Sequence, residues 1–155
     1  MDPYLHQYQV DVQWTGNRGT GTTGHRDYGR EHLLRVDGLP DLPGTADPTF
    51  HGDPDRWNPE QLLLGALAQC HMLSYFHVAV KHSVAVTGYT DAATGTLRLN
   101  RDGSGEFTQV LLRPRIVLAD ESQRDLADTL HEKAHRLCFI ARSVNFPVLN
   151  RPEAP

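Results

Sequence analysis

The chain has 155 residues, 39% of them hydrophobic and 22% charged, which is ordinary for a soluble fold and excludes collagen-like, low-complexity and disordered chains. Its formal net charge of -4 argues against a nucleic-acid-binding protein whose affinity comes from neutralising phosphates. No apolar run reaches the roughly 18 residues of a membrane helix, and the N-terminus carries no signal region, so we expect no membrane partner and a cytoplasmic location.

The N-terminal residues are predicted to form a β-hairpin. Apolar and polar side chains alternate over Tyr8–Trp14, which is the period of a half-buried strand, and a second extended segment covers Glu31–Val36. The glycine-rich stretch between them is typical of a hairpin connection. Residues 38–57 hold four prolines, so we expect a long loop there, of a kind that is often functional.

A long central helix is predicted after this loop. Asn58 suits the N-cap, Pro59 the first helical position and Glu60 the first turn. The run Gln61–His82 has no internal proline and is apolar over most of its circumference, which is typical of a helix covered on several sides. Its length of about 33 Å is large for a small domain, so we expect a partner subunit to cover part of it.

The C-terminal half is predicted to contain several strands and one further helix. In chain order these are a strand at 83–91, a turn at Thr94–Gly95, a strand through Leu97 and Leu99, a strand at 107–118 interrupted at Pro114, a helix at 122–137 and an extended segment at 143–149. There is no internal repeat and no linker. Residues 1–155 are therefore predicted as a single α+β domain, frayed at about 1–7 and 150–155.

Two short motifs match known sites only formally. Gly19, Gly21 and Gly24 spell G-x-G-x-x-G, but no amphipathic helix and no βαβ unit follow, so we interpret them as a hairpin turn rather than a dinucleotide site. His131 and His135 belong to an H-E-x-x-H motif, but the chain offers no convincing third zinc ligand after it. We interpret that motif as a half-exposed helix face, and we predict neither a metal nor a cofactor.

The two cysteines, Cys70 and Cys138, are too few for a disulfide-stapled secreted scaffold. Cys70 lies mid-helix, about 15 Å from the predicted helix start, so a reactive thiol there would need a cation from elsewhere in the fold. His71 follows it but points about 100° away around the helix, which argues against a Cys–His catalytic pair. From the residues alone, the cysteines are either inert core thiols or a redox pair.

Three segments of the sequence occur in a familiar order. They read T-G-N-R at 15–18, N-P-E-Q-L-L-L-G-A-L-A-Q-C at 58–70 and A-H-R-L-C at 134–138. They resemble the T-G-G-R turn, the N-P-E-[QD]-L-x(7)-C signature and the A-H-x-x-C segment of the OsmC/Ohr family, the osmotically inducible and organic hydroperoxide resistance proteins. Phe139 stands where the family usually has proline, and Gln69 and His71 also depart from the usual context. The resemblance is therefore to a side branch.

This resemblance implies a fold, a chemistry and partners. The fold would be α+β, with a strongly curved antiparallel sheet, two central helices and an intertwined homodimer that has two active sites at the subunit interface. Cys70 would be the peroxidatic and Cys138 the resolving cysteine. Arg18 would hold the Cys70 thiolate, and Glu60 would pair with that arginine. An organic hydroperoxide would be the substrate, and a dithiol, typically a lipoyl group, the reductant.

The residue chemistry is consistent with these roles. A thiolate attacks the O–O bond of a peroxide, whereas a free cysteine with a pKa near ~8.5 is mostly protonated. Arg18 stays charged and would favour the thiolate, and a buried arginine needs a carboxylate such as Glu60. Ten helical residues place Glu60 about 15 Å from Cys70. Either Glu60 acts from the partner chain, which we favour, or the helix begins later than Asn58.

The expected cycle forms a Cys70 sulfenic acid, releases an alcohol, and closes a Cys70–Cys138 disulfide that an external dithiol reduces. Large apolar side chains are predicted to wall a pocket for alkyl or lipid hydroperoxides, although they would serve equally well as plain core. They are Leu63, Leu67, Met72, Phe76 and Phe139. The alternative function is a non-catalytic OsmC-like binding or stress protein in which both cysteines are structural.

Overall fold

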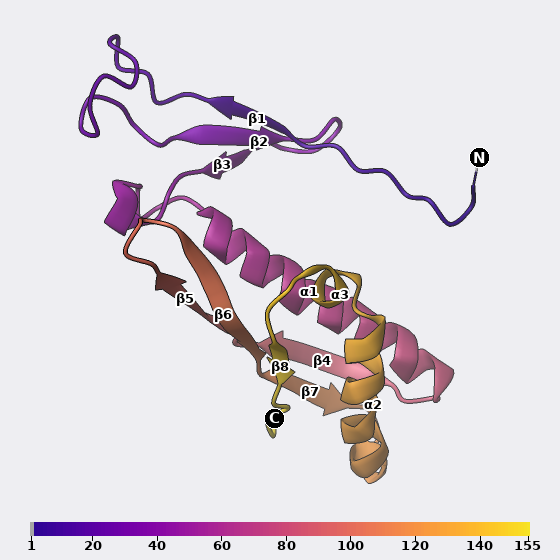
Figure 1. Ribbon diagram of the computed structural model, residues 1–155. Coiled ribbons are helices and arrows are strands. Elements are labelled where there is room, and N and C mark those ends of the chain that lie inside the picture. Colours follow the sequence, from indigo (N-terminus) through magenta and orange to yellow (C-terminus); the bar gives the residue numbers. More distant parts are fainter. Residues whose placement is uncertain (1) are drawn as a thin grey trace. The chain divides into compact units, whose positions relative to one another are not determined.

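The computed structural model of the protein describes residues 2–155 (Figure 1). They divide into two compact units, one ending at Leu62 and the other covering Leu63–Pro155. The boundary falls inside helix α1 (Pro59–Lys81). Met1, which belongs to the predicted frayed N-terminus, lies outside the described residues. The expectation of a single domain stays a prediction.

The N-terminal unit is built on an antiparallel sheet in the order β1-β2-β3. Its strands are β1 (Asp11–Trp14), β2 (His32–Arg35) and β3 (Leu42–Gly44). The predicted hairpin is confirmed, with Trp14 opposite His32. Strand β3 and a 3₁₀ turn at Pro48–Phe50 lie within the predicted loop, and the sequence did not reveal them because each is only three residues long.

The glycine motif of the hairpin connection forms a turn. Gly19 and Gly21 both adopt positive φ, a conformation that residues with a Cβ rarely reach. Their backbone N–H groups both donate to Asn17 Oδ1, at 2.9 and 3.1 Å. This stretch is followed by no helix before β2, so it lacks the context of a dinucleotide site.

The alternating apolar side chains before and in β1 are exposed in this chain, and the prediction of a half-buried strand is wrong for it. Tyr8 is 92% and Val12 68% exposed, and Val10 and Trp14 are exposed as well. The period-2 pattern correctly identified a strand with one apolar face, but a pattern of this kind cannot show whether another part of the fold buries that face.

Helix α1 begins where the sequence predicts. Asn58 Oδ1 accepts the N–H of Gln61 at 2.8 Å, and Gln61 Oε1 accepts the N–H of Asn58 at 3.1 Å, which is a reciprocal capping box. Pro59 is the first helical residue. The alternative of a later helix start is therefore wrong, and Glu60 and Cys70 are separated by ten residues of continuous helix.

Helix α1 also corrects the expectation that no segment is apolar enough to cross a membrane. By its length and mean hydropathy alone, this helix is long and apolar enough to cross a membrane. A core helix passes the same test, and five residues on α1 are buried in the fold: Leu67, His71, Tyr75, Val78 and Ala79.

The C-terminal unit contains two further sheets and two further helices. Its elements are β4 (Val86–Asp91), β5 (Thr94–Leu99), β6 (Gly105–Leu112), β7 (Pro114–Leu118), α2 (Arg124–Leu137), α3 (Phe139–Ser143) and β8 (Val148–Asn150). Strand β4 pairs with β7 and β5 with β6, all antiparallel, whereas β8 joins β6 in parallel. The α+β fold with mainly antiparallel sheets is thus confirmed, with β8 as the exception.

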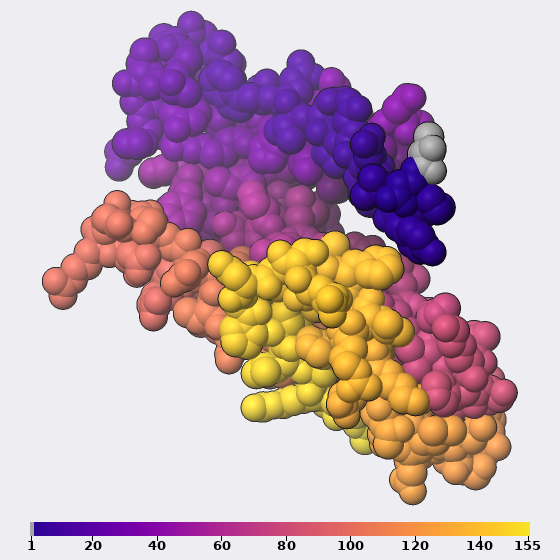
Figure 2. Space-filling view, turned by 45° about the vertical axis from the view of Figure 1, so that its right-hand side comes forward, coloured from indigo at the N-terminus to yellow at the C-terminus, as the bar shows by residue number. Residues whose placement is uncertain are grey.

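Four details of this unit differ from the sequence predictions. Thr94 and Gly95 pair with β6 instead of forming a turn, and Pro114 starts a strand of a different sheet instead of interrupting one strand. Helix α3 covers mainly residues for which no element was predicted and meets the segment expected to be extended only at Ser143. The C-terminal tail is also held at Glu153, which bridges to Arg115 through its backbone and its carboxylate. In the space-filling view, the yellow C-terminal residues lie against the orange residues of α2 (Figure 2).

Two apolar clusters form the core of the C-terminal unit. One joins α1, α2, β7 and Val84, which follows α1, through Tyr75, Leu130 and Ile116. The other joins Leu67 of α1 to β6 and β8. Because both clusters include residues of α1, this helix is central to the unit, as its apolar circumference predicts.

Candidate functional site

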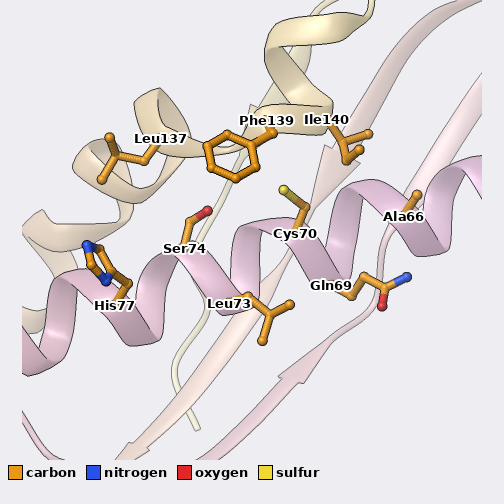
Figure 3. A pocket seen from close by; sticks show the side chains of 9 residues that line it. All are labelled: Ala66, Gln69, Cys70, Leu73, Ser74, His77, Leu137, Phe139 and Ile140. Atoms are coloured by element: carbon orange, nitrogen blue, oxygen red, sulfur yellow. The ribbon is translucent and has the colours of Figure 1, made fainter. Parts of the chain in front are cut away.

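An apolar cavity of about 510 Å³ lies between α1 and the segment that links α2 to α3 (Figure 3). Its volume is within the range of small-molecule sites. Most of its lining is apolar, and its polar residues all come from α1. The lining residues are Ala66, Gln69, Cys70, Leu73, Ser74, His77, Leu137, Phe139 and Ile140.

The structure brings Cys138 next to Cys70, which lines this cavity, although 68 positions separate the two cysteines in the sequence. Cys70 is half-buried and Cys138 is only 1% exposed, and both are free thiols. Burial, followed by the neighbouring Cys70 thiol, raises the pKa of Cys138 to about 11, so its thiol is protonated at neutral pH. Two reduced sulfurs therefore lie next to each other, and Cys70 is the one that lines the cavity.

Local structure fixes the position of Cys138. It lies at the junction of α2 and α3, where its extended backbone ends the first helix and starts the second. Its Sγ accepts the N–H of Ala141 at 3.4 Å and so acts as the N-cap of α3. This cap places Phe139 and Ile140 over Cys70, as Figure 3 shows. The proline that the family usually has at position 139 is replaced here by an aromatic ring.

Four of the five predicted pocket residues lie elsewhere. Phe139 lines the cavity, but Leu67 is fully buried in the second core cluster, and Leu63 packs against the same cluster. Phe76 packs against the first cluster, and Met72 is half-buried away from the cavity. Met72 and Phe76 are turned by roughly 160° and 120° from Cys70 around the helix, so they cannot share its face.

Residues that sequence reasoning missed occupy that face instead. Ser74 and His77 follow Cys70 at spacings of four and seven, so they lie on its side of α1, and Figure 3 shows all three facing the same linking segment. Ala66, Gln69 and Leu73 are the other lining residues on α1. The i, i+4, i+7 spacing from Cys70 was the signal that could have found Ser74 and His77.

Arg18 and Glu60 belong to the N-terminal unit. Arg18 is largely exposed, with Nη2 3.7 Å from Glu31 Oε1. Hairpin register explains this partner, because the carbonyl of Glu31 accepts the N–H of Thr15 and Trp14 pairs with His32. A Cβ on Gly16 or Gly29 would collide with the Glu31 carboxylate, so both glycines make room for it. The ion pair that the structure gives Arg18 is thus with Glu31, not with Glu60.

Two carboxylate oxygens near this hairpin and the helix start are buried without a hydrogen-bond partner. They are Oε2 of Glu31 and Oε2 of Glu60. A buried carboxylate oxygen without a donor costs free energy, so both carboxylates can accept a further cation or donor.

The H-E-x-x-H motif is not the half-exposed face that we expected. His131 is 3% exposed and hydrogen-bonds to His71, whereas His135 contacts the amide of Asn150. Among residues 2–155, no group of three or more histidine, cysteine or acidic side chains is arranged to hold a metal ion.

The fold and the site define a small α+β protein with two adjacent free thiols beside an apolar cavity. Residues 52–149 match the family described as OsmC-like protein, and the chain belongs to this family.

Several known proteins are similar to this chain. An OsmC-like protein of unknown function from Vibrio cholerae is 30% identical, with a TM-score of 0.86 over 96% of this chain and 100% of that one. An organic hydroperoxide resistance protein OsmC from Legionella pneumophila is 20% identical, with a TM-score of 0.69 over 97% and 98%. The uncharacterized protein YmaD of Bacillus subtilis is 24% identical over 90% of this chain and 87% of its own length.

Proposed function

We propose that the protein is a cysteine-based peroxidase that reduces alkyl and lipid hydroperoxides to alcohols. The observation that carries this proposal is the pair of free thiols, Cys70 and Cys138, at an apolar cavity of about 510 Å³. Membership of the OsmC-like family and a fold shared with organic hydroperoxide resistance proteins support it.

The first step oxidises Cys70. Its thiolate attacks the terminal oxygen of ROOH, the O–O bond breaks as an S–O bond forms, and the leaving alkoxide takes up a proton to become ROH. The sulfur is oxidised by two electrons and the peroxide is reduced by two. Cys70 suits this role better than Cys138, because it is the cysteine that lines the cavity.

The second step consumes Cys138. Its sulfur attacks the sulfur of the Cys70 sulfenic acid, an S–S bond forms, and the hydroxyl leaves with the Cys138 proton as water. The raised pKa of Cys138 supports a resolving rather than an attacking role, because a protonated thiol scarcely reacts with peroxide. A dithiol reductant, for which the family resemblance suggests a lipoyl group, then restores both thiols by exchange.

Activation of Cys70 requires a cation, and we assign it to Arg18. The guanidinium is permanently charged, largely exposed and held by a single carboxylate of Glu31. We propose that Glu60 acts across a homodimer, since about 15 Å of helix separates it from Cys70 of its own chain. Exposed apolar residues in both units, including Tyr8, Val12 and Phe139, support such a partner.

The cavity supports a preference for organic substrates. Its walls are side chains such as Leu73, Leu137 and Ile140, which gain nothing from binding hydrogen peroxide but bury the alkyl part of an organic hydroperoxide. Ser74 and His77 supply polar groups on the same side of α1. The proposed substrate is therefore an apolar hydroperoxide that presents its O–O bond to Cys70. We propose that the reaction takes place in the cytoplasm.

A thiol count tests the function. One equivalent of cumene hydroperoxide, added to the reduced protein, should remove both free thiols and release cumyl alcohol. Cys70→Ser should keep its remaining thiol, whereas Cys138→Ser should leave a sulfenic acid that dimedone traps. A surface variant, Ser143→Ala, is the matched control and should behave like the parent chain. Retention of both thiols in the parent chain contradicts the proposal.

A second function is favoured by one observation: Cys138 Sγ caps α3 and its thiol is held protonated, which is sufficient for a structural role. In that case, the protein would be a binding protein of the same family that takes apolar ligands into the cavity. Such a protein keeps both thiols with hydroperoxide but still binds cumyl alcohol, and calorimetry measures that binding directly.

A further inference from the structure

Two buried histidines join the helices that carry the two cysteines. His71 of α1 is fully buried and His131 of α2 is 3% exposed, and their Nε2 and Nδ1 atoms lie 3.1 Å apart. Tyr75 stacks on His131 with ring centroids 4.2 Å apart, and its hydroxyl donates to the carbonyl of Ala127 at 2.9 Å. These contacts join α2 to α1.

The histidine pair is built for two neutral rings. Each neutral imidazole carries one N–H, and one of them bridges the pair. The outer nitrogens, His71 Nδ1 and His131 Nε2, are buried without partners. One outer nitrogen already carries the N–H of the acceptor ring, and the other is bare. An added proton therefore goes either to the bare nitrogen, where the new N–H has no acceptor, or to the bridging nitrogen, where it breaks the hydrogen bond, and in both cases it puts a charge in the core.

The surrounding groups do not compensate such a charge. On α2, His135 and Arg124 both disfavour protonation of the pair, and Asp128 acts on Tyr75. On β4, Tyr89 lies behind Tyr75, with Asp91 beyond it. Burial, followed by the neighbouring rings of His131 and His135, lowers the pKa of His71 to about 3. Burial, followed by the Arg124 guanidinium, lowers the pKa of His131 to about 4.

The chain connects this pair directly to the thiols. His71 follows Cys70, and His131 precedes Cys138 by seven residues, or about two turns of α2. Because α2 is continuous to Leu137, the way α2 packs against α1 determines where Cys138 lies. We propose that His71 and His131 form a pH-sensitive latch that positions Cys138 beside Cys70 and releases it when the pair is protonated.

The size of the effect follows from linkage. In a released state, the imidazoles regain the ordinary pKa of 6.5, so acid favours release and the latch is lost as the pH falls below that value. Between pH 7 and pH 5, each histidine shifts the equilibrium toward release by about 25-fold, and the two together by about 600-fold.

Labelling of the buried thiol tests the latch without any catalytic step. In a Cys70→Ser background, only Cys138 reacts with 4,4′-dithiodipyridine, and the same chain unfolded in guanidinium gives the reference rate at each pH. The protection factor of Cys138 should fall by up to about 600-fold from pH 7 to pH 5, at constant far-UV ellipticity. A flat protection factor, or its loss together with the ellipticity, overturns the proposal.

Variants assign the effect to the pair. His71→Leu with His131→Leu should abolish the pH dependence, whereas the cavity histidine variant His77→Leu should retain it in full. If the double variant does not fold, His71→Gln alone serves, with a fall of about 25-fold in place of 600-fold. An unchanged fall of the protection factor in the double leucine variant or in His71→Gln contradicts the latch.

The consequence for catalysis rests on the proposed function. With one equivalent of hydroperoxide, the unmodified chain should accumulate more dimedone-trapped sulfenic acid at pH 5.5 than at pH 7, relative to Cys138→Ser, and the double leucine variant should not. If no sulfenic acid forms at any pH, the peroxidase proposal fails, while the labelling experiment still decides on the latch.

Discussion

Truncation of two leucines on α1 should separate core from cavity. Leu67 is fully buried against Val110, Leu112 and Val148, and Leu73 is 59% exposed at the cavity. Leu67→Ala removes three carbons, worth roughly 2.4 kcal/mol in transfer free energy, and leaves a void that brings the loss to about 3–4 kcal/mol. Leu73→Ala should change the free energy of unfolding by less than about 0.5 kcal/mol.

Urea unfolding followed by circular dichroism measures both values. In the peroxidase assay, Leu73→Ala should have the larger effect of the two variants. It should raise the KM for cumene hydroperoxide about fivefold, as expected for about 1 kcal/mol of lost apolar contact, and leave the KM for hydrogen peroxide unchanged. Leu67→Ala should change neither KM at a temperature where it stays folded. Equal losses of stability in the two variants would refute the assignment of Leu67 to the core and Leu73 to the cavity.

Three further outcomes are expected. Asn58→Ala should lower the free energy of unfolding by about 1 kcal/mol in urea titrations, because it removes half of the capping box of α1. Because the pKa values of His71 and His131 are lowered in the fold, the unfolded chain binds more protons than the folded chain below pH 6.5. The urea concentration at half-unfolding should therefore decrease as the pH is lowered from 6.5 to about 4; a constant urea concentration would contradict this. Glu31→Gln should slow thiol oxidation by on the order of tenfold, because it removes the carboxylate that holds Arg18, while changing the free energy of unfolding by under about 1 kcal/mol; an unchanged rate would separate the ion pair from catalysis.

The elements that the sequence predicted are those with local causes. Asn58 and Pro59 fix the start of α1 through capping and the fixed φ of proline, and the period-2 pattern identifies β1. The elements it missed, β3 and α3, are three and five residues long. They exist because β2 supplies hydrogen bonds to one and Cys138 caps the other, and both are too short to show a recognisable period in the sequence.

The candidate site divides in the same way. The family motifs singled out both cysteines, but the side chains around Cys70 could not be ranked, because α1 is apolar nearly all round and carries no periodic signal of which face is core. Phe139 was the one predicted wall residue at the cavity, while Ser74 and His77 were missed. Glu31 was missed because its pairing with Arg18 depends on the hairpin register.

By itself, the amino-acid sequence determined that α1 begins at Pro59 and that the chain is an α+β protein, and it singled out its two cysteines as a candidate redox pair. These properties depend on backbone propensity, capping and residue type, which act over a few positions. Only the tertiary structure decided that Cys138 joins Cys70 at an apolar cavity and that His71 meets His131 in the core. Such contacts depend on how α2 packs on α1, and packing is set by the summed burial of side chains far apart in the sequence.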